Sequence, residues 1–122
     1  MEVRKKVLII DDEVDTCLLL SNYFTKHGCD VTCSNSLSEG LQLLDVVNPD
    51  IIFLDNNLPD GFGWEVTSFI LNKKPTADLH LITAYNNSMF DSKKAADKVR
   101  LWQKPISFKK LDEILKKKNA SK

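Results

Sequence analysis

The fold is decided by the stretch Asp50-Ile51-Ile52-Phe53-Leu54-Asp55-Asn56-Asn57-Leu58-Pro59-Asp60-Gly61. Residues 51–54 form an unbroken apolar run, which predicts a strand of a parallel sheet that helices cover on both faces. Asp55 then stands at the carboxyl end of that strand, where open α/β sheets bind their ligands. Pro59 and Gly61 break the strand at once, because proline restricts φ and glycine accepts positive φ. A lone aspartate at such a place more often only begins a turn, so the rest of the chain must decide its role.

The composition predicts one cytosolic domain over residues 1–122, with a core at about 6–117 and a polar tail at 118–122. With 43% hydrophobic residues, the chain can bury a core without disulfides. Lys and Arg number 17, as do Asp and Glu, so no basic field attracts nucleic acid. No segment is apolar enough for a signal peptide or a membrane span, and we expect neither nucleic acid nor a membrane as a direct partner.

The three cysteines, Cys17, Cys29 and Cys33, are an odd number, and reduced thiols are expected in the cytosol. Together with His27, they have a spacing that matches no zinc-binding template. We therefore interpret all three as small buried hydrophobic residues.

Strand and helix patterns alternate five times along the chain. Strands are expected at residues 7–10, 30–34, 51–54, 79–83 and 100–103. Helices are expected from Val14 to a C-cap at Gly28, from a capping box at residues 36–39 to Asn48-Pro49, at 64–71, at 86–98, and after a cap at Ser107. This alternation predicts a parallel sheet with helices on both faces.

Helical periodicity also predicts which side chains of three helices face the core. The expected buried faces are Val14, Cys17, Leu18, Ser21 and Phe24 in the first helix, Leu37, Leu41 and Leu44 in the second, and Phe108, Leu111, Ile114 and Leu115 in the last.

Polar side chains gather where the expected strands end. Right-handed crossovers bring the carboxyl ends of parallel strands to one edge of the sheet. Every expected strand except the second ends in polar residues there, namely Asp11, Asp12, Asp55, Thr83 and Lys104. One such residue can arise by chance, but four strands out of five indicate a site.

These groups together favour phosphoryl chemistry. Carboxylates in one pocket repel each other, so that one must take a proton or a cation must join them. Acids, a backbone carbonyl and water form an all-oxygen site of the kind that Mg²⁺ prefers. Lys104 can pair with a carboxylate at rest and with a phosphoryl oxygen later, and Thr83 offers a hydroxyl donor to the same oxygen. An aspartate can attack phosphorus and form an acyl phosphate.

At this point the chain resembles the receiver domain of response regulators in bacterial two-component systems, of the chemotaxis-regulator type. The resemblance covers residues 6–115 and rests on Val7-Leu8-Ile9-Ile10-Asp11-Asp12-Glu13, on Asp55 followed by Leu58-Pro59 and Gly63, on Thr83-Ala84, and on Lys104-Pro105. It implies a doubly wound, flavodoxin-like (βα)5 sandwich of three layers, whose five parallel strands have the order 2-1-3-4-5.

The resemblance also implies the roles of the acids. Asp55 would be the phosphoacceptor. Asp12, the Asp55 carboxylate and the main-chain carbonyl of Asn57 would hold Mg²⁺, or Mn²⁺ as the alternative ion, and Asp11 would contribute through water.

The remaining site residues follow in the same way. Thr83 would swing toward the phosphoryl group, Lys104 would bind it, and the small Ala84 would leave the site open. The bond before Pro105 would be cis, which an X-Pro bond tolerates. The neutral side chains of Asn57 and Tyr85 would flank the phosphoryl group, and we expect slow to moderate loss of phosphate.

The family implies a sensor histidine kinase or a histidine phosphotransferase as the phosphoryl donor. A downstream protein would bind the face of the fourth helix, fifth strand and last helix, and the chain would act as a monomer or as a homodimer that phosphorylation promotes. It would be a signalling protein that catalyses its own phosphorylation, rather than an enzyme. Leu101 replaces the aromatic residue that is usual three positions before the lysine, and Trp102 follows it. We expect looser coupling between Thr83 and the output face.

Three other classes were weighed. A phosphatase of the haloacid dehalogenase type needs an Asp-x-Asp pair, but Glu13 occupies its second position. A pseudo-receiver that only binds partners usually lacks an acid, the acceptor or the lysine, and all are present. A DNA-binding regulator would need an output domain after Lys122, whereas a receiver taken from a hybrid kinase would have the same sequence features.

Overall fold

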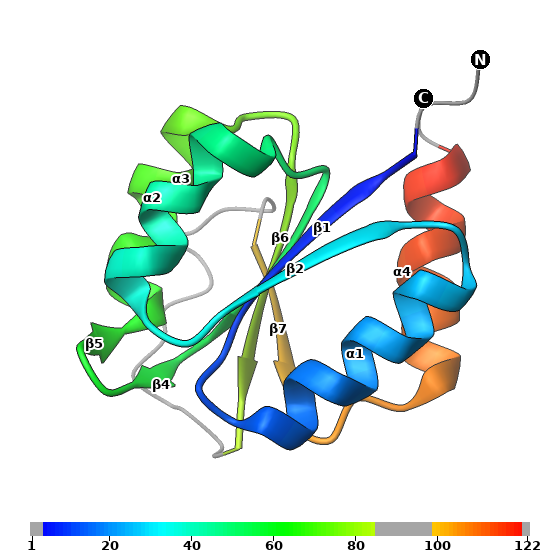
Figure 1. Cartoon of the computed structure of the whole chain (residues 1–122), viewed down its shortest axis with the longest axis horizontal. Coiled ribbons are helices and arrows are strands. Elements are labelled where there is room, and N and C mark those ends of the chain that lie inside the picture. Colours follow the sequence, from blue (N-terminus) through cyan, green and yellow to red (C-terminus); the bar gives the residue numbers. More distant parts are fainter. Residues whose placement is uncertain (1–3, 85–98, 121–122) are drawn as a thin grey trace.

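The structure, a computed structural model, describes residues 4–84 and 99–120, and its centre is a five-stranded parallel sheet (Figure 1). The spatial order is β2-β1-β3-β6-β7. A small antiparallel pair, β4 and β5, follows β3 and shifts the later labels, so the five strands stand in the expected order 2-1-3-4-5. The bounds are β1 Lys6–Ile10, β2 Asp30–Ser34, β3 Ile51–Asp55, β4 Asn57–Leu58, β5 Gly61–Phe62, β6 Asp78–Thr83 and β7 Val99–Gln103.

Helices cover both faces of the sheet and make the three layers that the sequence predicts. In Figure 1, α1 and α4 lie on one side of the strands, and α2 and α3 lie on the other. The bounds are α1 Val14–Lys26, α2 Leu37–Val47, the 3₁₀ helix η1 Gly63–Val66, α3 Thr67–Lys73 and α4 Phe108–Ala120. The helix expected at 86–98 lies outside the described residues. None of the described helices is both long and apolar enough to cross a bilayer.

The central strands are buried on both faces, as their continuous apolar runs predict. Every residue of β3 is buried. Successive side chains along a strand point to opposite faces. Accordingly, Phe53 packs in one core under α1 and α4, whereas its neighbour Leu54 packs in a second core under α2 and α3.

The face that α1 buries differs from the prediction. Val14 and Leu18 are 69% and 55% exposed, whereas Leu20 and Tyr23 are buried beside Cys17 and Phe24. The helical period is right, but the buried stripe is rotated about the axis. Residues 17–20 are apolar throughout, so two overlapping stripes satisfy the period, and the stripe that buries a tyrosine removes more area from water.

Several smaller expectations also need correction. Phe108 is 58% exposed, although its ring stacks on Tyr23 with centroids 5.8 Å apart. Cys33 is exposed because it lies on the edge strand β2, and only Cys17 and Cys29 are buried thiols. Leu41 is only partly buried against the second core. The segment expected as one helix at 64–71 begins with the 3₁₀ turn of η1.

The boundaries of α2 follow its capping residues. Ser36 Oγ accepts the Glu39 N–H at 3.2 Å, as a helix N-cap does. The Glu39 carboxylate instead accepts the N–H of Asn35, at 3.4 Å, so the expected capping box is closed one residue early. Asn48 ends the helix in the left-handed conformation, with φ of 52°.

Candidate functional site

The site is built around two buried acids on adjacent strands. β1 and β3 pair in parallel with Ile10 opposite Leu54, so that the following residues, Asp11 and Asp55, emerge side by side. Asp11 is fully buried and Asp55 is 3% exposed, whereas the adjacent Asp12 is exposed. Carboxylate oxygens of these three aspartates all lie within 4.8 Å of one another. Such a set of oxygen ligands fits a hard divalent cation.

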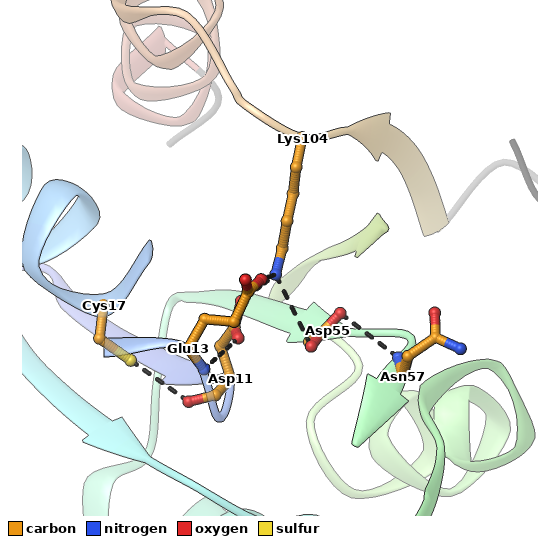
Figure 2. Close-up of polar contacts among 6 residues, drawn as sticks. All are labelled: Asp11, Glu13, Cys17, Asp55, Asn57 and Lys104. Atoms are coloured by element: carbon orange, nitrogen blue, oxygen red, sulfur yellow. Dashed lines mark hydrogen bonds and ion pairs between the residues drawn. The ribbon is translucent and has the colours of Figure 1, made fainter. Parts of the chain in front are cut away.

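Lys104 reaches this acid pair from the far side of the sheet. Its Nζ lies 2.8 Å from Asp11 Oδ2 and 3.7 Å from Asp55 Oδ2, and it also contacts the Glu13 carboxylate (Figure 2). The Lys104 backbone N–H donates to the carbonyl of Thr83 at 2.8 Å, which holds the start of the loop after β7 against the end of β6. The lysine therefore bridges residues that come from three different strands.

Burial and charge shift the pKa values of both partners. Desolvation and the charge of Asp11 raise the pKa of Asp55 to about 7, against the opposing effects of Lys104 and of the Asn57 N–H. Burial lowers the pKa of Lys104, but contacts with Asp11 and Glu13 outweigh it and raise that pKa above its ordinary value. The buried acids thus carry more negative repulsion than one lysine removes, which favours an additional cation.

The loop after Asp55 is held in place by backbone donors. The Asn57 N–H donates to Asp55 Oδ1 at 3.3 Å. In the turn between β4 and β5, the Asp60 carboxylate accepts the N–H groups of Leu37 and Ser38 at 2.9 and 3.0 Å, and these two hydrogen bonds lower the pKa of Asp60. The hairpin that carries the Asn57 carbonyl is thereby tied to the first turn of α2.

Gly63 lies directly behind the acceptor. A Cβ at this position would stand 2.6 Å from the Asp55 carbonyl oxygen, so only glycine allows this close approach. The glycine behind Asp55 in the sequence pattern is thus explained by packing against the acceptor strand.

The other expected site residues lie around this centre. Thr83 is buried at the end of β6, beside the exposed Ala84. The Lys104–Pro105 peptide is cis, as predicted. Leu101 is 40% exposed on β7, away from the acids. Tyr85 lies outside the described residues.

The sequence analysis missed three contributors. Glu13 contacts Lys104, and its place directly after Asp11-Asp12 was the available signal. Ser34 ends the one strand that was expected to contribute nothing, and its carbonyl accepts the Asp11 N–H at 2.9 Å. Cys17 Sγ donates to the Asp11 carbonyl at 3.4 Å, a contact that no local pattern indicates.

A family model described as "Response regulator receiver domain" matches residues 7–116. The chain belongs to this family. As a receiver domain of two-component signalling it confirms the resemblance inferred from the motifs at the strand ends.

Two bacterial relatives illustrate the range of the family. Sporulation initiation phosphotransferase F of Bacillus subtilis is 27% identical over 119 residues, which cover 94% of each chain. The response regulator protein PilR of Pseudomonas aeruginosa is 32% identical over 84 residues, which cover 69% of this chain but 19% of PilR. The receiver domain thus corresponds to about a fifth of that longer relative.

Solved structures confirm the fold. A two-component response regulator from Clostridium difficile has a TM-score of 0.86 at 23% identity, covering 97% of this chain and 98% of that one. A response regulator from Burkholderia pseudomallei, solved with a phosphorylated aspartic acid, a calcium ion and citrate, has a TM-score of 0.78 at 20% identity, covering 93% of this chain and 72% of that one.

Proposed function

We propose that this receiver domain accepts a phosphoryl group on Asp55 from a phosphohistidine donor in the presence of Mg²⁺. The observation that carries the proposal is the convergence of Asp11, Asp55 and Lys104 in one buried cluster, with Nζ 2.8 and 3.7 Å from the two carboxylates. Metal ligands, a nucleophile and a cation are all present within reach of one phosphorus atom.

The chain offers a complete set of oxygen ligands for the ion. Asp12 and Asp55 would hold Mg²⁺ together with the main-chain carbonyl of Asn57, and Asp11 would act through water. Mn²⁺, which also prefers oxygen ligands, is the alternative. When bound, the ion supplies positive charge that offsets the repulsion of the acids and the charge of the transferring group.

The transfer itself uses side chains of this chain. A carboxylate oxygen of Asp55 bonds to phosphorus while the bond from phosphorus to the donor imidazole nitrogen breaks, and the imidazole keeps the electron pair. Lys104, released from Asp11 and Glu13, places its positive charge on a phosphoryl oxygen. The hydroxyl of Thr83 donates to another oxygen of the same group. Thr83 would thereby report phosphorylation to the edge of the sheet.

The relatives support this assignment. One is named a phosphotransferase, and one solved response regulator carries a phosphorylated aspartic acid beside a calcium ion. The domain would act as a phosphoacceptor rather than as an enzyme on a separate substrate. Its partners would be a cytoplasmic histidine kinase or histidine phosphotransferase, and a downstream protein that binds near β7 and α4.

The proposal is tested by intact mass spectrometry after incubation with acetyl phosphate and Mg²⁺. The wild type is expected to gain a single phosphoryl mass, and Asp55→Asn none. Asp45→Asn, which changes an exposed acid of α2, is the matched control and should label like the wild type. Labelling that persists in Asp55→Asn, or that needs no divalent ion, would overturn the assignment.

The lifetime of the phosphoryl group gives a second test. We expect slow to moderate loss, because Asn57 and Tyr85 offer no acid or base to the attacking water. Decay of the labelled mass is followed after removal of acetyl phosphate. A half-life of seconds that replacement of Asn57 or Tyr85 leaves unchanged would contradict the expectation.

A further inference from the structure

A second cavity lies at the opposite end of the sheet from Asp55. It has a volume of about 440 Å³ and is lined by residues 75–80, by Arg100 and Trp102 of β7, and by Glu113, Ile114 and Lys117 of α4. These residues come from the amino-terminal half of β6, whereas Thr83 at the other end of β6 borders the acid cluster. The volume falls within the range of small-molecule sites, about 300–1,000 Å³.

The inner wall of this cavity carries a buried hydrogen-bond donor. His80 is 4% exposed, and its ring stacks on Phe53 with centroids 5.1 Å apart. Trp102 Nε1 lies 2.9 Å from His80 Nδ1. Because an indole nitrogen can only donate, Nδ1 must accept, and the proton of the neutral imidazole resides on Nε2. Within residues 4–84 and 99–120, this Nε2 has no hydrogen-bond partner.

His80 stays neutral, so the donor persists over the physiological pH range. Burial, followed by the charges of Arg100 and Lys118, lowers the pKa of His80 to about 4. A buried donor without a partner costs about 1–3 kcal/mol. An acceptor placed at Nε2 would recover part of this free energy.

Positive charge stands beside the donor. Arg100 is the register partner of His80 across β6 and β7, so its side chain starts on the same face of the sheet. Lys117 approaches from α4. The acids at the rim are Asp78, whose carboxylate pairs with Lys118 Nζ at 3.7 Å, and the exposed Glu113. Among the described residues, no carboxylate pairs with Arg100 or Lys117, whose charges remain available to a ligand.

The remaining walls are apolar. Ala77 and Leu79 are buried on the strand side, Ile114 is buried on the helix side, and the half-buried Trp102 adds a flat ring. A ligand must therefore combine an acceptor with a hydrocarbon body.

We propose that this cavity binds a small aromatic carboxylic acid, with its carboxylate between His80 Nε2–H and the Arg100 guanidinium and its ring against Trp102 and Ile114. A carboxylate satisfies the buried donor and the neighbouring cation together, which a neutral acceptor cannot do. The site is independent of phosphorylation at Asp55.

The experiment is a titration of the ¹⁵N-labelled protein with benzoate, followed by NMR. Saturable shifts are expected for the Trp102 indole and for amides of residues 77–80, with those of Asp11 and Asp55 unchanged. Benzamide, the neutral isostere, should bind roughly fivefold more weakly, the range of an exposed ion pair. His80→Phe keeps an aromatic ring without the donor and should weaken benzoate about tenfold, the range of one hydrogen bond.

Arg100→Gln is the second variant, and its exposed position makes it compatible with folding even if His80→Phe unfolds. It should remove the preference for benzoate over benzamide, while Arg4→Gln, a matched exposed control, should retain it. The proposal is overturned if benzoate gives no saturable shift, which would mean that water alone fills the cavity. It is equally overturned if the preference for benzoate persists in Arg100→Gln.

Discussion

The two ends of this sheet bury polar groups in opposite ways. At the carboxyl end, Asp11 and Asp55 are buried with Lys104 between them. At the amino end, His80 is buried as a neutral ring, and one of its nitrogens has no partner in the described chain. A buried charge without a counter-charge costs far more free energy than a single unpaired N–H. Charged groups can therefore be buried only where the fold supplies partners or an ion, whereas a neutral donor can wait for a ligand.

The largest effect should come from removing the cation at the carboxyl end. Lys104→Gln takes away the charge that faces both acids, and phosphorylation by acetyl phosphate should slow by about 10²-fold or more, the usual effect of losing one stabilising group in the transition state. The rate is measured by intact mass over time. Lys109→Gln, on the exposed side of α4, should keep the wild-type rate. An equal rate in both variants would show that the lysine contact in Figure 2 is only structural.

The amino end should be the more sensitive to acid in its folding. The folded pKa of His80 is about 4, below the ordinary 6.5, so the unfolded chain binds the extra proton first. The contribution of His80 is therefore complete above pH 6.5 and is lost as the pH falls toward 4. It should remove about 2 kcal/mol from the unfolding free energy between pH 7 and pH 5.

Urea unfolding at several pH values measures this loss. His80→Gln should flatten the decline, and carboxylates that titrate in both proteins cancel in the comparison. His27→Gln changes the other histidine, which is exposed, and should decline as the wild type does. A wild-type slope in His80→Gln would contradict the argument that the buried imidazole is kept neutral.

The smallest effect concerns Glu13, which competes for Lys104 at rest. Its side chain is 58% exposed, so its ion pair with the lysine contributes at most about 1 kcal/mol. Glu13→Gln should release Lys104 toward the phosphoryl group and speed labelling by acetyl phosphate roughly two- to fivefold. Asp15→Asn, an exposed acid of the same segment, should leave the rate unchanged. Slower labelling of Glu13→Gln would show that Glu13 assists transfer instead of restraining the lysine.

Local patterns predicted much of this molecule because they act within a few residues. The apolar runs at residues 7–10 and 51–54 became fully buried strands, and Ser36 caps α2 as expected. The polar residues that follow the strands were placed at one edge by the handedness of parallel crossovers alone. By contrast, α1 buries Leu20 and Tyr23 in place of Val14 and Leu18, because the period of a helix does not specify which of two overlapping stripes meets the sheet.

The amino-acid sequence by itself determined the family, the order of the strands and the identity of the candidate phosphoacceptor, since each depends on short motifs and on their sequence along the chain. Only the tertiary structure decided that Glu13 holds Lys104, that Asp60 ties the hairpin to α2, and that Trp102 fixes the proton of His80. Each of these contacts joins residues more than 20 positions apart. Their distances depend on how all the layers pack together, which no local pattern contains.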